Sequence, residues 1–77
     1  MEGLGEKKSW APIERLFSRE ECADFMYMGA SGTIQQYKHR DTRRYINIDS
    51  VSGEFYLYSN RSYVKVSQAV ALAYVYG

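Results

Sequence analysis

The pattern of hydrophobic and polar positions predicts a three-stranded antiparallel sheet in the middle of the chain. Three runs rich in Ile, Tyr, Phe and Thr cover residues 33–39, 43–49 and 54–58, and clusters of turn residues separate them. β-Branched and aromatic residues bounded in this way are typical of strands in a meander. Residues 63–66 also alternate between apolar and polar and are compatible with a short fourth strand.

Two helices are predicted before this meander. Ser18 and Glu21 have the spacing of a capping box, so a helix should follow over residues 19–28. Its apolar face should contain Cys22, Phe25 and Met26. A proline at position 12 suits the first turn of a shorter helix over residues 12–17.

A further helix is predicted at the carboxyl end of the chain. Ser67 can cap a helix over residues 68–76, and Gly77 can close it. This helix carries no charged residue, so it should either pack in the core or join two copies of the chain in a homodimer. Its packing face should consist of Ala69, Leu72, Ala73 and Tyr76.

The order of elements predicts one α+β domain over residues 10–77, with the meander between an N-terminal and a C-terminal helix (α-β-β-β-α). Residues 1–9 combine two glycines and mixed charges with almost no apolar side chains, and should form a flexible N-terminal arm. The core should contain Ile34, Ile46, Ile48, Phe55, Leu57, Phe25, Leu72 and Ala73.

The two faces of the sheet depend on the register of the first hairpin, because a shift by one residue exchanges them. A two-residue loop at 41–42 would place Tyr37 beside Ile46 and Ile48, whereas a three-residue loop at 40–42 would place Ile34 there. The second register is preferred because it buries Ile34. It leaves an exposed face, flanked by Gln35 and Asn47, on which four tyrosines lie: Tyr37, Tyr45, Tyr56 and Tyr58.

Charge is unevenly distributed along the 77 residues, although the formal net charge is only +1. Residues 1–32 contain four Lys and Arg against six Asp and Glu, and residues 33–65 contain six against three. The first hairpin should therefore have a basic tip, formed by Lys38, Arg40, Arg43 and Arg44. Such a tip can bind phosphates or simply keep an edge strand soluble.

The chain offers little to catalytic chemistry. Cys22 is the only cysteine and His39 the only histidine, and the two lie on different predicted elements. Cys22 should be a small buried thiol, and His39 a solvated residue near the hairpin tip. We therefore predict a protein that is not an enzyme and binds no metal or cofactor. A single cysteine fits a reducing, cytoplasmic location, and no apolar run reaches the roughly 18 residues of a membrane helix.

Two families share features with the chain. The run 43–48, Gly53, the run 56–58 and the Ala-rich segment 69–74 resemble the AP2/integrase type of DNA-binding domain. That resemblance implies a sheet that enters the major groove of DNA. The α-β-β-β-α order also resembles a double-stranded RNA-binding domain, although Ser67-Gln68-Ala69-Val70 lacks the lysines with which that family begins its last helix.

These observations favour a small interaction protein. Excess tyrosine and arginine together with near-neutral net charge indicate a protein partner with an acidic rim. By analogy, a chain of this size is typical of inhibitors that phages or mobile elements direct against a host enzyme. The alternative is a DNA- or RNA-binding module using the same face. The predicted binding residues are Tyr37, Lys38, Arg40, Arg43, Arg44, Tyr45, Asn47, Tyr56 and Tyr58.

Overall fold

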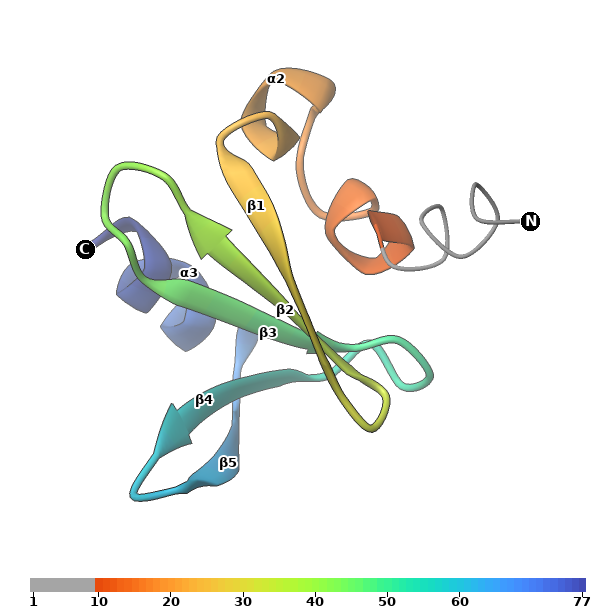
Figure 1. Ribbon diagram of the computed structural model, residues 1–77, viewed down its shortest axis with the longest axis vertical. Helices are drawn as coiled ribbons and strands as arrows, with labels where there is room; N and C mark the ends of the chain where they lie inside the picture. The colour runs from red at the N-terminus through yellow and green to blue at the C-terminus, as the bar shows by residue number, and fades with distance from the viewer. Residues whose placement is uncertain (1–9) are drawn as a thin grey trace.

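Five antiparallel strands in chain order form the sheet of the computed structural model, which describes residues 10–77 (Figure 1). They are β1 (Phe25–Ser31), β2 (Ile34–His39), β3 (Tyr45–Asp49), β4 (Phe55–Ser59) and β5 (Ser62–Val66). The predicted α+β class and antiparallel meander are confirmed, and so is a strand at 63–66. The predicted number of strands, three or four, was too low. The prediction of a flexible arm over residues 1–9 lies outside the described residues.

The missed strand is β1, where the sequence had predicted a helix over 19–28. The capping box forms as predicted, with the amide of Glu21 donating to Ser18 Oγ at 3.2 Å and the amide of Ser18 donating to Glu21 Oε1 at 2.8 Å. The helix that it begins, α2 (Arg19–Cys22), is only one turn long. The chain then becomes extended, which buries Phe25 and exposes Met26. The predicted helix was wrong because Phe25–Ser31 gains an antiparallel ladder with β2, which is interrupted only by an irregularity between Tyr27 and Gly29.

The first helical segment also differs from its prediction. It covers residues 10–14 of the described chain instead of 12–17. It places Ile13, which is fully buried, against the sheet. The Trp10 ring lies 5.6 Å from the Tyr37 ring and 6.4 Å from the Tyr27 ring, so this segment covers the start of the meander.

The register of the first hairpin differs from the predicted one. Tyr37 lies opposite Ile46, and Ile34 lies opposite Asp49. Hydrogen bonds from the His39 amide to the Arg44 carbonyl and from the Arg43 amide to the His39 carbonyl, both 2.8 Å, close the loop. The preferred register was wrong because this closure turns Tyr37 toward the core, where it is 0% exposed and buries a larger side chain than Ile34 would.

The C-terminal helix α3 (Gln68–Tyr76) has the predicted bounds and caps. Ser67 Oγ accepts a hydrogen bond from the Val70 amide at 3.2 Å, and Gly77 follows the last turn at φ +79°. Its packing face was predicted only in part. Leu72 packs against the core and the Tyr76 ring contacts Phe25 and His39, as expected, but the buried residues are Ala71 and Val75, and Ala69 and Ala73 are exposed.

The loop between β2 and β3 sets this orientation of α3. The Thr42 hydroxyl donates to the Val75 carbonyl at 2.6 Å, and the Arg44 guanidinium donates to the Tyr74 carbonyl at 3.1 Å. Both carbonyls lie in the last turn of α3, where intrahelical donors run out, and the Tyr74 carbonyl also accepts from the Gly77 amide at 3.2 Å.

One hydrophobic cluster joins both helical ends of the chain to the sheet. Its buried members are Ile13, Phe25, Tyr37, Ile46, Ile48, Ala71 and Val75. Of the other predicted core residues, Phe55 and Leu72 pack against this cluster, Leu57 and Ile34 are half-buried, and Ala73 is exposed. No helix within residues 10–77 has the length and apolar character needed to span a membrane.

The prediction that His39 is solvated was also wrong. Its ring is 5% exposed and lies edge-on to Phe25 and Tyr76, at 4.9 and 5.3 Å between ring centroids. Its Nδ1 atom accepts from the amides of Asp41 and Thr42, at 3.1 and 3.4 Å. His39 is therefore a structural residue that holds the β2–β3 loop.

Candidate functional site

The sheet opens into a cleft where β3 and β4 diverge. These strands pair at only two positions, Asn47 with Tyr56 and Ile48 with Phe55, whereas β4 pairs with β5 along its whole length. The resulting β3–β4 cleft has a volume of about 520 Å³, a size typical of ligand-binding pockets. Its lining residues are Ser31, Gln36, Tyr45, Asn47, Leu57, Tyr58, Tyr63 and Tyr74.

Two amide side chains hold the cleft in shape. Gln36 Nε2 donates to the hydroxyl of Tyr63, which joins β2 to β5 across the two intervening strands. The sheet is therefore strongly curved at this point. Asn47, which is 2% exposed, donates from Nδ2 to the Tyr56 carbonyl at 3.0 Å. Because both amides are bound, they fix the positions of the tyrosines around them.

Four of the eight lining residues are tyrosines, and they come from β3, β4, β5 and α3. Tyr58 lies opposite Tyr63 in the ladder, with their rings 5.0 Å apart at 61°. Tyr58 is 60% exposed and Tyr74 is 44% exposed, so both remain accessible. Tyrosine offers a large contact area with a polar tip and loses little side-chain entropy on binding. The cleft thus presents a rigid aromatic surface.

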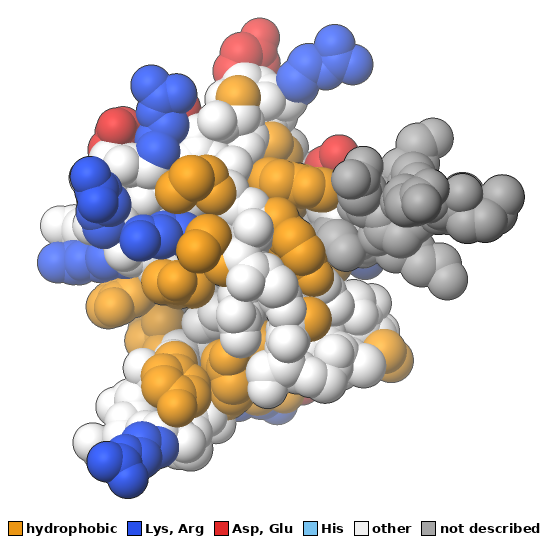
Figure 2. Space-filling view, viewed as in Figure 1, with side chains coloured by type: hydrophobic (Ala, Val, Ile, Leu, Met, Phe, Trp, Pro, Cys, Tyr) orange, Lys and Arg blue, Asp and Glu red, His pale blue; other side chains and the backbone are white. Residues whose placement is uncertain are grey.

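Basic side chains border this surface. The Arg44 guanidinium lies 5.1 Å from the centre of the Tyr74 ring, and Lys38 Nζ lies 6.0 Å from the centre of the Tyr45 ring. Both distances are within the range of a cation–π interaction. Figure 2 shows Lys and Arg side chains gathered over the β2–β3 loop and at the tip of the β4–β5 hairpin, with hydrophobic side chains between them. We call these cations, together with Arg43 and Arg61, the basic rim.

Arg43 and Arg61 stand in an unusual backbone conformation. Their φ angles are +64° and +66°, in the left-handed region that favours glycine. Within residues 10–77 neither side chain has an ion pair or a hydrogen bond. Figure 1 places their two loops, β2–β3 and β4–β5, on the same side of the molecule as the diverging ends of β3 and β4. No contact that stabilises the fold therefore accounts for an arginine, in place of glycine, at either position.

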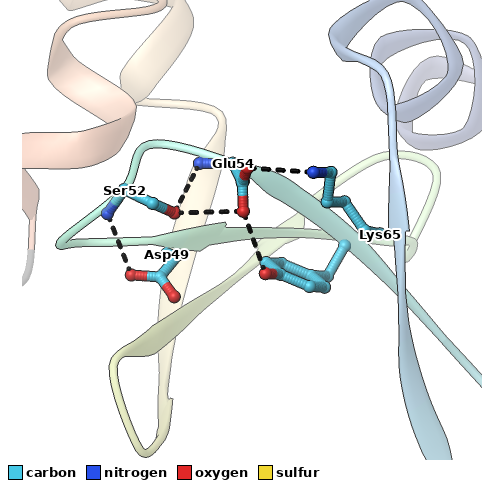
Figure 3. Close-up of polar contacts among 5 residues, drawn as sticks. Asp49, Ser52, Glu54 and Lys65 are labelled. Carbon is cyan, nitrogen blue, oxygen red and sulfur yellow. Dashed lines mark hydrogen bonds and ion pairs between the residues drawn. The ribbon is translucent and has the colours of Figure 1, made fainter.

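Polar contacts hold the β3–β4 turn, at the end of these strands where they are paired (Figure 3). Asp49 Oδ1 accepts from the amides of Val51 and Ser52, at 2.8 and 3.2 Å, and these bonds lower the pKa of the Asp49 carboxyl. Glu54 binds Lys65 at 3.0 Å, and this contact lowers the pKa of the Glu54 carboxyl. Together these contacts hold the turn that joins β3 to β4.

The predicted binding residues divide into several groups. Tyr45 and Tyr58 line the cleft, and Asn47 forms part of its floor. Lys38, Arg43 and Arg44 belong to its basic rim.

The remaining predicted residues lie elsewhere. Tyr37 is in the core, where burial raises the pKa of its hydroxyl. Tyr56 bonds Glu54 outside the cleft lining, at 3.3 Å. Arg40 lies 3.9 Å from the carboxylates of both Asp24 and Asp41.

Six residues of the site were not among the predicted binding residues: Ser31, Gln36, Leu57, Tyr63 and Tyr74 of the lining, and Arg61 of the basic rim. Tyr63 and Tyr74 reach the cleft only through the curvature of the sheet and the docking of α3. Arg61 follows Asn60 in a two-residue turn, and that short polar link between alternating runs was a signal for a hairpin.

Groups capable of chemistry lie away from the cleft. Burial and the nearby carboxylates of Glu14 and Glu21 raise the pKa of the Cys22 thiol, which reduces its reactivity at neutral pH. Over the described residues 10–77, no group of three or more His, Cys, Asp or Glu side chains could hold a metal ion.

Comparison of the chain with models of protein families, with curated proteins and with solved structures finds no match. The function is therefore inferred from the cleft itself.

Proposed function

We propose that this chain is a non-enzymatic interaction protein that binds a protein partner through the β3–β4 cleft and its basic rim. The observation that carries the proposal is the pair of arginines with positive φ beside a cleft lined by four tyrosines. Tyrosine and arginine are the residues that, with tryptophan, contribute most often to binding hot spots.

The backbone conformation of the two arginines supports a binding role. A residue with a Cβ atom loses roughly 1–2 kcal/mol in the left-handed region, and glycine avoids this cost. For a domain whose stability should be about 5–15 kcal/mol, two such positions are a considerable loss. Strained residues of this kind cluster at functional sites. Arg43 and Arg61 are therefore best explained by what their exposed guanidinium groups bind.

The charge of the site indicates an acidic partner. Lys38 and Arg44 lie beside the lining rings of Tyr45 and Tyr74, and Arg43 and Arg61 lie in the β2–β3 and β4–β5 loops. The acidic side chains of α2 lie on a different element. A partner segment with carboxylates on both sides of an apolar contact would match this arrangement. Complementary charge of this kind mainly accelerates association and excludes wrong partners.

A capture experiment with two charge-matched variants tests the proposal. Arg43→Glu/Arg61→Glu reverses the two unpaired cations, and Arg15→Glu/Arg19→Glu makes the same change of net charge on the N-terminal segments. We expect the wild type and the second variant to retain a discrete protein from nuclease-treated lysate, and the first variant to lose it. Equal capture by both variants would contradict the proposal.

Nucleic acid is the alternative ligand, because tyrosine rings can stack on bases while Arg and Lys bind phosphates. Its affinity should fall steeply and log-linearly with salt, whereas a hot-spot interface should weaken only modestly. The tyrosine arrangement favours protein, because Tyr45 and Tyr74 already have cations beside their rings and Tyr58 packs against Tyr63. Capture that depends on intact nucleic acid would favour the alternative.

A further inference from the structure

The backbone at the mouth of the cleft has unused hydrogen-bonding groups. Successive residues of a strand direct their N–H and C=O groups alternately to the two neighbouring strands. The Asp49 amide donates to the Glu54 carbonyl at 2.9 Å, so Asp49 is directed toward β4. Asn47 and Tyr45 lie two and four residues before Asp49, so their backbone groups are also directed toward β4. Asn47 is paired with Tyr56, but Tyr45 lies beyond the last paired position.

The facing strand has the same property. The Glu54 carbonyl accepts from the Asp49 amide, so Glu54 is directed toward β3. Every second residue after it is directed the same way, whereas Phe55, Leu57 and Ser59 are directed toward β5. Tyr58 is therefore directed toward β3, where the next rung of the ladder would join it to Tyr45. That rung is missing, and within residues 10–77 no backbone or side-chain hydrogen bond replaces it. The cleft thus offers two N–H donors and two C=O acceptors between two strands.

We infer that the cleft binds its partner as an added β-strand, an extended acidic segment whose backbone pairs with Tyr45 and Tyr58. This inference rests on the proposed function and specifies how the partner is held. Strand addition supplies affinity through main-chain hydrogen bonds, and side-chain contacts supply specificity. Here the adjacent contacts would be the rings of Tyr63 and Tyr74 and the cations of the basic rim.

Charge and geometry indicate what kind of segment binds in the cleft. A segment that pairs with Tyr45 and Tyr58 runs along β3 and β4 and leaves the cleft at its open end. There the β2–β3 loop and the β4–β5 turn, which carry Arg43 and Arg61, flank it on two sides. Carboxylates on the segment would neutralise both unpaired guanidinium groups. An oligonucleotide can satisfy the cations, but it cannot continue a β ladder, since its backbone has no N–H donors.

The first test uses the free protein and amide hydrogen exchange measured by NMR. The amides of Asn47 and Tyr56 should be protected because they belong to the ladder. The amides of Tyr45 and Tyr58 should exchange at least about tenfold faster, because an amide without a hydrogen-bond partner is not protected. Equal protection at all four positions would overturn the inference, since the missing rung would then be closed.

The second test uses a phage-displayed library of random dodecapeptides selected against the wild-type chain. Enriched sequences should be rich in Asp and Glu and should lose about tenfold or more in affinity toward Arg43→Glu/Arg61→Glu, but not toward Arg15→Glu/Arg19→Glu. Each peptide bond of the best synthetic peptide is then replaced in turn by an ester, which removes one N–H donor. We expect two adjacent replacements to weaken binding strongly and to leave the amides of Tyr45 and Tyr58 unprotected.

The outcomes separate the two levels of the account. An acidic peptide that binds the cleft but tolerates every ester would overturn strand addition and leave the proposed function in place. Enrichment of no acidic peptide, together with binding of an octadeoxythymidine probe, would overturn both. Peptide binding that is unaffected in Tyr58→Ala/Tyr63→Ala would also overturn both, because the ligand would lie outside the cleft.

Discussion

The substitution Arg61→Gly should stabilise the protein while weakening its binding. Arg61 has a φ of +66° in the β4–β5 turn, and no other described residue contacts its side chain by an ion pair or hydrogen bond. Glycine would relieve roughly 1–2 kcal/mol of backbone strain but lose about 0.5–1 kcal/mol through the greater freedom of the unfolded chain. The net gain should be about 0.5–1 kcal/mol, which raises Tm by about 2–8 °C for a domain of this size.

Urea and thermal unfolding of three variants measure this effect. Arg61→Ala removes the charge and keeps the strain, so its stability should equal that of the wild type or be slightly lower. Asn60→Gly changes the neighbouring position, at φ +50°, and should gain less because asparagine tolerates this region. An Arg61→Gly protein that melts at or below the wild-type temperature would refute the reasoning, because the arginine would then contribute to folding.

Three further predictions concern stability. The pKa of Tyr37 is raised, chiefly by burial, so the folded state keeps a proton that the unfolded state loses above pH about 10. Above that pH the free energy of unfolding should fall by up to about 1.4 kcal/mol per pH unit, and it should fall less in Tyr37→Phe. A free energy of unfolding in urea that stays constant from pH 9 to 11 would argue against this. The lowered pKa values of Asp49 and Glu54 predict a contribution to stability that is present above pH about 4 and lost on acidification. The stability of Asp49→Ala should therefore depend less on pH in this range. An acid titration of the variant identical to that of the wild type would count against this prediction. Thr42→Val removes the donor to the Val75 carbonyl and should cost about 1 kcal/mol in urea unfolding, so an unchanged midpoint would show that this contact does not hold α3.

Local signals in the sequence predicted the elements whose structure is decided locally. The cap at Ser67 and the terminal Gly77 set the bounds of α3, and the turn at 50–53 set the pairing of Ile48 with Phe55. That pairing also fixed which side of β3 and β4 carries Tyr45 and Tyr58, so half of the tyrosines in the cleft could be predicted.

The errors arose where pairing between distant segments decides the structure. Cys22, Phe25, Met26 and Gly29 fit the spacing of a helix face, whereas in the structure the burial of Phe25 to Met28 alternates as in a strand. The ladder with β2 favours the strand, and this could not be read from either pattern alone. Tyr63 reaches Gln36 from 27 residues away because the sheet curves. The cleft is a product of this curvature.

Photo-crosslinking tests the central claim most directly, because it identifies what lies in the cleft. Benzoylphenylalanine would replace Tyr58 in one sample and Val51, which is 80% exposed in the β3–β4 turn, in a control. After crosslinking in lysate and mapping by mass spectrometry, position 58 should join to an acidic, extended segment of one protein, and position 51 should not. Crosslinks from position 58 to nucleic acid alone, or the same protein captured equally from both positions, would contradict the account.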